Sequence, residues 1–134
     1  MKSQHLGLCS LLWILCTAVG CGPPEFCRVE GIVTHKGKPV PFLQISFSPV
    51  DPELVRPPLG FSDKEGKFQM RTARTEGVKR GEYHIFVDDP ERVGGGRTST
   101  EPDYLYVIDR YSAENTDITV DFQNHQDNFE LKLD

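Results

Sequence analysis

From residue 28 onward, apolar and polar positions alternate along the chain with a period of two. The clearest run is 43–48, where Leu43, Ile45 and Phe47 alternate with polar side chains. Alternation of this kind is typical of strands with one buried face, and each run here is bounded by turn residues. Seven strands are expected on this basis, at 28–35, 43–48, 59–62, 67–72, 81–87, 116–122 and 128–133.

No stretch shows a sustained helical repeat, so no helix is expected to cover a sheet. The sheets must then cover each other, which predicts an all-β fold, a seven-stranded antiparallel β-sandwich, over 28–134. Residues 63–66 are expected to form a hairpin turn, with Gly66 at the position of positive φ. The pattern also makes the apolar residues of each run the expected core.

The connection 88–113 is the exception to these short spacings. Loops longer than about 15 residues are uncommon in compact domains and are often functional. Three consecutive glycines at 94–96 predict that this connection moves.

Six short motifs carry a resemblance to a known family. They are VEGIV at 29–33, GKPVP at 37–41, ISFSP at 45–49, FSDKEGKF at 61–68, GEYHI at 81–85 and, after Tyr111, ITV at 118–120. In order and spacing they are similar to the carboxypeptidase regulatory-like domain, which has the transthyretin-like or prealbumin-like architecture, and in particular to short bacterial lipoproteins with one such domain. The resemblance implies a non-catalytic accessory or structural module without a shared active site.

The amino terminus has the organisation of an export signal. A short polar start that carries Lys2 precedes a mainly apolar run at 6–19. That run is shorter than the roughly 20 residues that span a bilayer as a helix. Residues 1–20 are therefore expected to be a signal peptide.

Cys21 is the expected lipidation site. The segment Ala18-Val19-Gly20-Cys21 resembles the lipobox of bacterial lipoproteins, which is cleaved before a cysteine that receives a diacylglyceryl group. The alternative is ordinary signal cleavage, which small residues at 18 and 20 also suit. With lipidation, 21–27 becomes a lipidated cysteine and a Pro-rich tether, and the membrane becomes a partner through the lipid on Cys21.

The location expected from these features is the periplasmic face of the cell envelope, as an exported and membrane-anchored lipoprotein. Gly22 stands where an Asp often signals retention at the inner membrane, so the outer membrane is preferred. Cys9 and Cys16 would leave with the signal. Cys27 is then a single unpaired thiol, or forms a bridge to Cys21 or to another molecule.

The chain of 134 residues is acidic, with a formal net charge of −5. Binding to nucleic acid relies on dense Lys and Arg, so no nucleic-acid partner is expected. His35 and His125 are expected in turns and His84 on the outer face of a strand, all solvated and without the spacing of metal ligands. No metal or cofactor is expected.

Two sets of residues on the 88–113 connection are candidates for binding. Asp88, Asp89 and Glu91, with Glu101 and Asp103 further on, could supply oxygens to a calcium ion. Tyr104, Tyr106 and Tyr111 could form a stacking platform for a sugar or peptide. The simpler reading is that the acidic loop is solvated, that Tyr104 and Tyr106 belong to an extra strand, and that Tyr111 closes the end of the sandwich.

No catalytic motif occurs in the sequence: there is no Gly-x-Ser-x-Gly elbow, His-Glu-x-x-His pair or phosphate loop. The sequence therefore favours a lipid-anchored, non-catalytic module with a structural or protein-interaction role and an envelope protein as partner. The alternative is a carbohydrate- or calcium-binding module that uses the 88–113 loop, with a glycan as partner.

Overall fold

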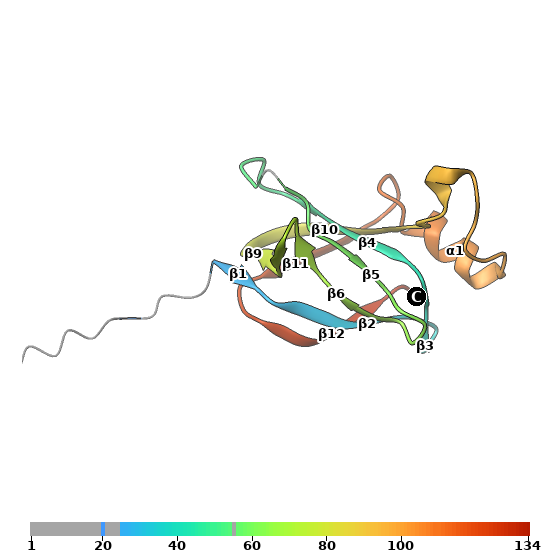
Figure 1. The fold of residues 1–134 in the computed structure, drawn as a ribbon, viewed down its shortest axis with the longest axis horizontal. Coiled ribbons are helices and arrows are strands. Elements are labelled where there is room, and N and C mark those ends of the chain that lie inside the picture. The colour runs from blue at the N-terminus through green and yellow to red at the C-terminus, as the bar shows by residue number, and fades with distance from the viewer. Residues whose placement is uncertain (1–19, 21–24, 55) are drawn as a thin grey trace, which may run out of the picture.

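The structure, a computed structural model, describes residues 20, 25–54 and 56–134. Residues 1–19 of the expected signal, and the expected lipidation site Cys21, lie outside the described residues. The described chain is predominantly β, with two main sheets and one short α-helix (Figure 1). The prediction of a β-rich domain is confirmed.

The larger sheet has six strands in the order β11-β10-β4-β5-β7-β8, and its neighbours are antiparallel. At its centre, Ile85 lies opposite Phe47 and Val87 opposite Ile45, and all four side chains are buried. The predicted alternation is confirmed in these strands. The strands are β4 (Gln44–Pro49), β5 (Leu59–Phe61), β7 (Arg71–Thr72), β8 (Thr75–Glu76), β10 (Gly81–Asp88) and β11 (Ile118–Phe122).

The second sheet is built on β2 (Val29–His35), which has neighbours on both sides. The short strands β3 (Lys38–Pro39) and β6 (Lys67–Gln69) pair with it in antiparallel fashion. On its other side β12 (Gln126–Lys132) runs parallel to it. This pair departs from the wholly antiparallel arrangement that was expected, because alternation reveals a buried face but not the direction of the neighbouring strand.

The segment 67–72 divides between the two sheets at Met70. Its first part, β6, pairs with β2, and its second part, β7, pairs with β5 and β8. Met70 is fully buried, and its N–H donates to the carbonyl oxygen of Val29 at 2.8 Å. The predicted turn at 63–66 is present, with Gly66 at φ 76°, but it leads from one sheet to the other.

The fold begins earlier than the expected boundary at residue 28. Phe26 and Cys27 form β1, which pairs with β9 (Val78–Lys79). Cys27 is fully buried and is the only cysteine among the described residues, and burial raises the pKa of its thiol. The last residues of the expected tether are therefore part of the folded domain.

The buried side chains of both sheets form a single core. Phe47 of β4 and Phe122 of β11 stack with ring centroids 5.2 Å apart, and Phe122 meets Phe129 of β12 edge to face at 5.4 Å. The face of each sheet that the alternation made apolar thus packs against the other sheet. Further members of the core are Val29, Val33, Phe68, Tyr83, Leu131 and Leu133.

The prediction that the chain has no helix is wrong. The 88–113 connection contains the 3-10 turn η1 (Arg92–Gly94) and the helix α1 (Pro102–Arg110). Pro102 suits the first turn of a helix, where its missing N–H has no intrahelical partner. None of the helices in the described part of the chain is both long and apolar enough for a membrane span.

The two ends of the domain carry different elements (Figure 1). The chain enters at β1, beside β9, at one end. The turn between β2 and β3, the helix α1 and the last residues gather at the other end. This separation decides what each end can contact.

Candidate binding cleft

A cleft of about 430 Å³ lies at the end that carries α1. Its walls come from two segments far apart in sequence, 38–42 and 98–104, with the end of β2 between them. Its volume is within the range of small-molecule sites. The lining residues are His35, Lys38, Pro39, Val40, Pro41, Phe42, Thr98, Ser99, Glu101, Asp103 and Tyr104.

Phe42 presents its ring at this cleft in an unusual backbone conformation. Its φ is 56°, and 50% of the residue is exposed. Bulky residues rarely adopt a positive φ of this size. Two hydrogen bonds hold the backbone there: the N–H donates to Ser62 O at 3.1 Å, and the carbonyl accepts from the Tyr104 hydroxyl at 3.2 Å. The surrounding structure therefore fixes an exposed aromatic ring on one wall.

His35 lies at the floor of the cleft, at the end of β2, and is 4% exposed. Its Nδ1 hydrogen-bonds the carbonyl oxygen of Leu133, which can only accept, so Nδ1 carries the proton. Nε2 is buried and has no hydrogen-bond partner among the described residues. The nearest charged atom is Oδ1 of Asp103, at 3.7 Å.

The prediction that His35 is solvated in a turn is wrong. The C-terminal residues after β12 pass beside the end of β2 and cover the ring, and Tyr106 of α1 lies against it with ring centroids 5.5 Å apart. His84 and His125 are exposed as expected. Among the histidines that the structure describes, His35 is thus the one that is buried.

Charged groups of both signs surround the mouth of the cleft. Lys36 Nζ lies 3.2 Å from Oδ1 of Asp103, and this hydrogen bond together with the lysine charge lowers the pKa of Asp103. Lys38 and Glu101 are exposed on the lining. With two lysines and two carboxylates, the charge of the rim is balanced.

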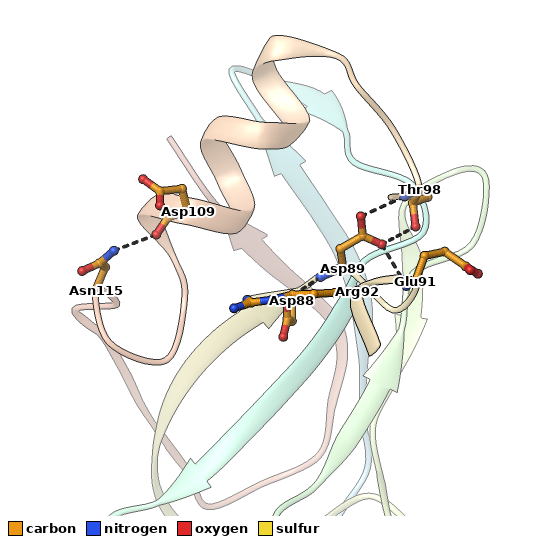
Figure 2. A network of polar contacts seen from close by, with 7 residues as sticks. All are labelled: Asp88, Asp89, Glu91, Arg92, Thr98, Asp109 and Asn115. Atoms are coloured by element: carbon orange, nitrogen blue, oxygen red, sulfur yellow. Dashed lines mark hydrogen bonds and ion pairs between the residues drawn. The ribbon is translucent and has the colours of Figure 1, made fainter. Parts of the chain in front are cut away.

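The predicted acidic residues Asp88, Asp89 and Glu91 are not part of the cleft lining. Asp89 instead bonds Thr98, which is part of that lining (Figure 2). Asp89 is buried, and Oδ1 accepts from the Glu91 N–H at 3.0 Å and from the Thr98 hydroxyl at 2.5 Å. Its Oδ2 accepts from the Thr98 N–H at 2.8 Å. Burial raises the pKa of Asp89, but these hydrogen bonds outweigh burial and lower it.

Asp88 is engaged in the same local way. Its Oδ1 accepts from the Asp89 N–H at 2.8 Å and pairs with Arg92 at 3.2 Å. No three His, Cys, Asp or Glu side chains in the described ranges gather in a manner that would hold a metal ion. The arrangement makes Asp89 an anchor for the segment that forms one wall of the cleft.

Tyr104 and Tyr106 lie on α1, so the expectation of an extra strand there is wrong. Tyr104 is buried and Tyr106 is exposed, because positions two apart face different sides of a helix. The two rings therefore do not form a common platform. Tyr111 is buried, and its hydroxyl hydrogen-bonds the carbonyl oxygen of Asp134, in agreement with its expected role at the end of the domain.

Comparison with known proteins gives no assignment: no protein-family model matches the chain, and no significant match exists among curated proteins or solved structures. The geometry of the cleft is therefore the basis for a functional argument.

Proposed function

We propose that this chain is a non-catalytic recognition module of the cell envelope, exported and held at a membrane by a lipid on Cys21. The observation that carries the proposal is that the cleft is lined by residues of β3, of the segment after it and of α1. These elements lie at the end of the domain opposite β1 (Figure 1). Only four residues, 22–25, separate Cys21 from β1, which begins at Phe26. An extended chain of this length reaches no more than about 18 Å. A lipid there keeps the β1 end at the membrane and turns the cleft away from it.

For the fold itself, we propose the finer description of a seven-stranded β-sandwich of the carboxypeptidase regulatory-like type. Its support is the shared core between two sheets and the agreement of β4, β10 and β11 with the alternation. The order and spacing of the six sequence motifs are the second support for this description. The parallel pairing of β12 with β2 departs from the wholly antiparallel sandwich that the sequence predicts.

Binding rather than catalysis is favoured by the hydroxyl groups of the cleft. The Thr98 hydroxyl donates to Asp89, and Ser99 Oγ accepts from the Glu101 N–H at 3.1 Å. Neither hydroxyl hydrogen-bonds His35, so among the described cleft residues no nucleophile is paired with a base. What remains is an aromatic wall with polar groups, which is the usual composition of a binding site.

The anchor is tested by following incorporation of a labelled fatty acid in cells that produce the full chain. The wild-type protein and Cys27→Ala are expected to carry label, and Cys21→Ser to carry none. Cys27→Ala is the matched control because it removes the only described cysteine and leaves Cys21 in place. Label on Cys21→Ser, or no label on the wild type, contradicts the anchor.

The role of the cleft is tested with a photo-crosslinking amino acid in the anchored protein. Position 101 lies on the cleft lining, and position 82 is an exposed site on β10 outside it. A crosslinked envelope component is expected from position 101 and not from position 82. Equal products from both positions, or none from position 101, contradict recognition through the cleft.

A further inference from the structure

Two unfavourable features of the domain meet at the cleft. Phe42 holds a positive φ with its ring half exposed, and His35 keeps a buried Nε2 without a partner among the described residues. Strained backbone and unsatisfied buried polar atoms each destabilise a fold, and they cluster at functional sites. Both features are accounted for if the cleft receives a ligand.

The polar groups on the floor call for a hydrogen-bond donor. The Asp103 carboxylate accepts hydrogen bonds, and Nε2 of His35, the ring nitrogen that does not bind Leu133, has no partner among the described residues. Asp103 pairs with Lys36, but the two side chains are 62% and 67% exposed, so a shift of this pair toward solvent opens Nε2 to a group in the cleft. A hydroxyl group has a single hydrogen to donate, so two neighbouring hydroxyl groups of one ligand are needed to bond both Asp103 and Nε2 of His35.

The charge balance of the rim favours a neutral ligand over an ion. A cation would meet Lys36 and Lys38, and an anion would meet Asp103 and Glu101. A ligand that both donates and accepts hydrogen bonds without a net charge avoids each repulsion. Hydroxyl groups have this property.

The aromatic wall adds a requirement for an apolar face. The ring of Phe42 is exposed beside Pro39 and Pro41, which together form a hydrophobic surface on one side of the cleft. A sugar ring has such a face of C–H groups, with hydroxyl groups around its edge. Aromatic rings bury a large area on contact at low entropic cost.

We infer that the cleft binds a neutral saccharide, which stacks one ring on Phe42 and hydrogen-bonds Asp103 and Nε2 of His35 through neighbouring hydroxyl groups. The inference rests on the proposed function, because it names the ligand class of the same cleft. The volume of about 430 Å³ suits a short saccharide or the end of a chain.

The test is isothermal titration calorimetry with the full chain, purified from membranes in detergent. The probes are neutral hexasaccharides of glucose, xylose, mannose and N-acetylglucosamine, with the corresponding monosaccharides as a second arm. At least one hexasaccharide is expected to bind, and Phe42→Gly is expected to weaken its affinity by about tenfold or more. Phe61→Ala is the matched control, because Phe61 is an equally exposed phenylalanine, 54% against 50%, on β5 outside the cleft.

Phe42→Gly suits the positive φ, so the fold is expected to survive the loss of the ring. His35→Phe is a second variant, which removes Nε2 and is expected to weaken binding of the same saccharide. A monosaccharide that binds as tightly as its hexasaccharide identifies a free sugar as the ligand, and tighter binding of the hexasaccharide identifies a glycan chain.

Three results overturn the inference: no hexasaccharide binds at about 10 mM, Phe61→Ala weakens binding as much as Phe42→Gly, or a hexauronate binds more tightly than every neutral probe. If a crosslinked envelope protein is still obtained from position 101, the saccharide alone is refuted and the proposed function stands. If the crosslink is absent too, both fail.

Discussion

Thr98 and Asp89 are joined by two hydrogen bonds, one from the backbone N–H of Thr98 and one from its hydroxyl (Figure 2). They connect the end of β10 with the segment that leads into α1, across the 3-10 turn. Because Asp89 is only 3% exposed, its carboxylate depends on these donors in place of water. The contact holds one wall of the cleft to the sheet.

Removal of the Asp89 carboxylate is expected to destabilise the domain. Asp89→Ala leaves the Thr98 and Glu91 N–H groups without their acceptor. A loss of about 2–3 kcal/mol in the free energy of unfolding is expected. Glu91→Ala is the control, because it keeps the N–H that donates to Asp89 and removes only an exposed carboxylate. Urea unfolding measures both, and equal stabilities of the two variants contradict the prediction.

The same carboxylate predicts a dependence of stability on pH. The pKa of Asp89 is lowered in the folded protein from its ordinary value of 3.8, so the carboxylate stabilises the fold above that value. This contribution is lost as the pH falls through the lower, folded pKa. Urea unfolding between about pH 6 and pH 2 should show a smaller acid-induced loss for Asp89→Asn than for the wild type. An identical acid-induced loss of stability in both proteins contradicts a contribution from the Asp89 carboxylate.

Gly31 is expected to tolerate no side chain, because β12 passes too close. A Cβ at this position would lie 1.7 Å from the carbonyl oxygen of Phe129. Gly31→Ala is therefore expected to destabilise the domain by about 3 kcal/mol, through separation of β2 from β12. Gly94→Ala is the control, because a Cβ there would meet nothing within 4 Å, and its stability is expected to stay close to that of the wild type. Thermal melts of the two variants and the wild type check both expectations.

At position 42 a glycine variant is expected to be more stable than an alanine variant, the reverse of their usual order in stability. The φ of 56° at Phe42 strains residues that carry a Cβ, whereas glycine adopts it without this penalty. Phe42→Gly should therefore be more stable than Phe42→Ala by about 1 kcal/mol. Phe61 on β5 provides the opposite case, where Ala is expected to be favoured by about 0.5–1 kcal/mol. Denaturant unfolding of the four variants checks the order, and the same sign at both positions excludes strain at Phe42.

The ion pair at the mouth of the cleft predicts a change in the titration of Asp103. Lys36 is the main cause of its lowered pKa, and Lys38 contributes least among the nearby groups. Lys36→Met is therefore expected to raise the Asp103 pKa toward its ordinary value, and Lys38→Met to move it less. Carbon-13 NMR titration of the side-chain carboxyl resolves the two, and a larger effect from Lys38→Met is inconsistent with the observed pair.

The central strands could be predicted from sequence because their signal is local. At Leu43, Ile45 and Phe47 every second side chain is fully buried, as the alternation requires. The partner and direction of a strand have no such local signal. The sequence therefore could not show that β12 runs parallel to β2, or that 67–72 divides between two sheets.

The helix α1 has a sequence signal, but that signal is ambiguous. Tyr104, Val107 and Ile108 have the i, i+3, i+4 spacing of a helix face, and Pro102 stands at its start. The pair Tyr104 and Tyr106 also fits the two-residue period of a strand. In so short a segment both periods are satisfied, and contact with the core selects the helix.

The cleft itself could be predicted least. Its walls are 38–42 and 98–104, and His35 is covered by Leu133, which follows β12. The one sequence signal is Phe42, an aromatic residue in the polar phase of the 43–48 alternation. Burial of His35 and the approach of Asp103 arise only from the tertiary arrangement.

The pairing of β2 with β12 also constrains when the domain can form during synthesis. The contact of Arg28 with His125 at the start of this pair joins residues 97 positions apart. Contacts between such distant residues form slowly, because a long loop must close first. The nascent chain therefore leaves the ribosome with one edge of β2 unpaired, and this edge is covered only after β12 at 126–132 has been made.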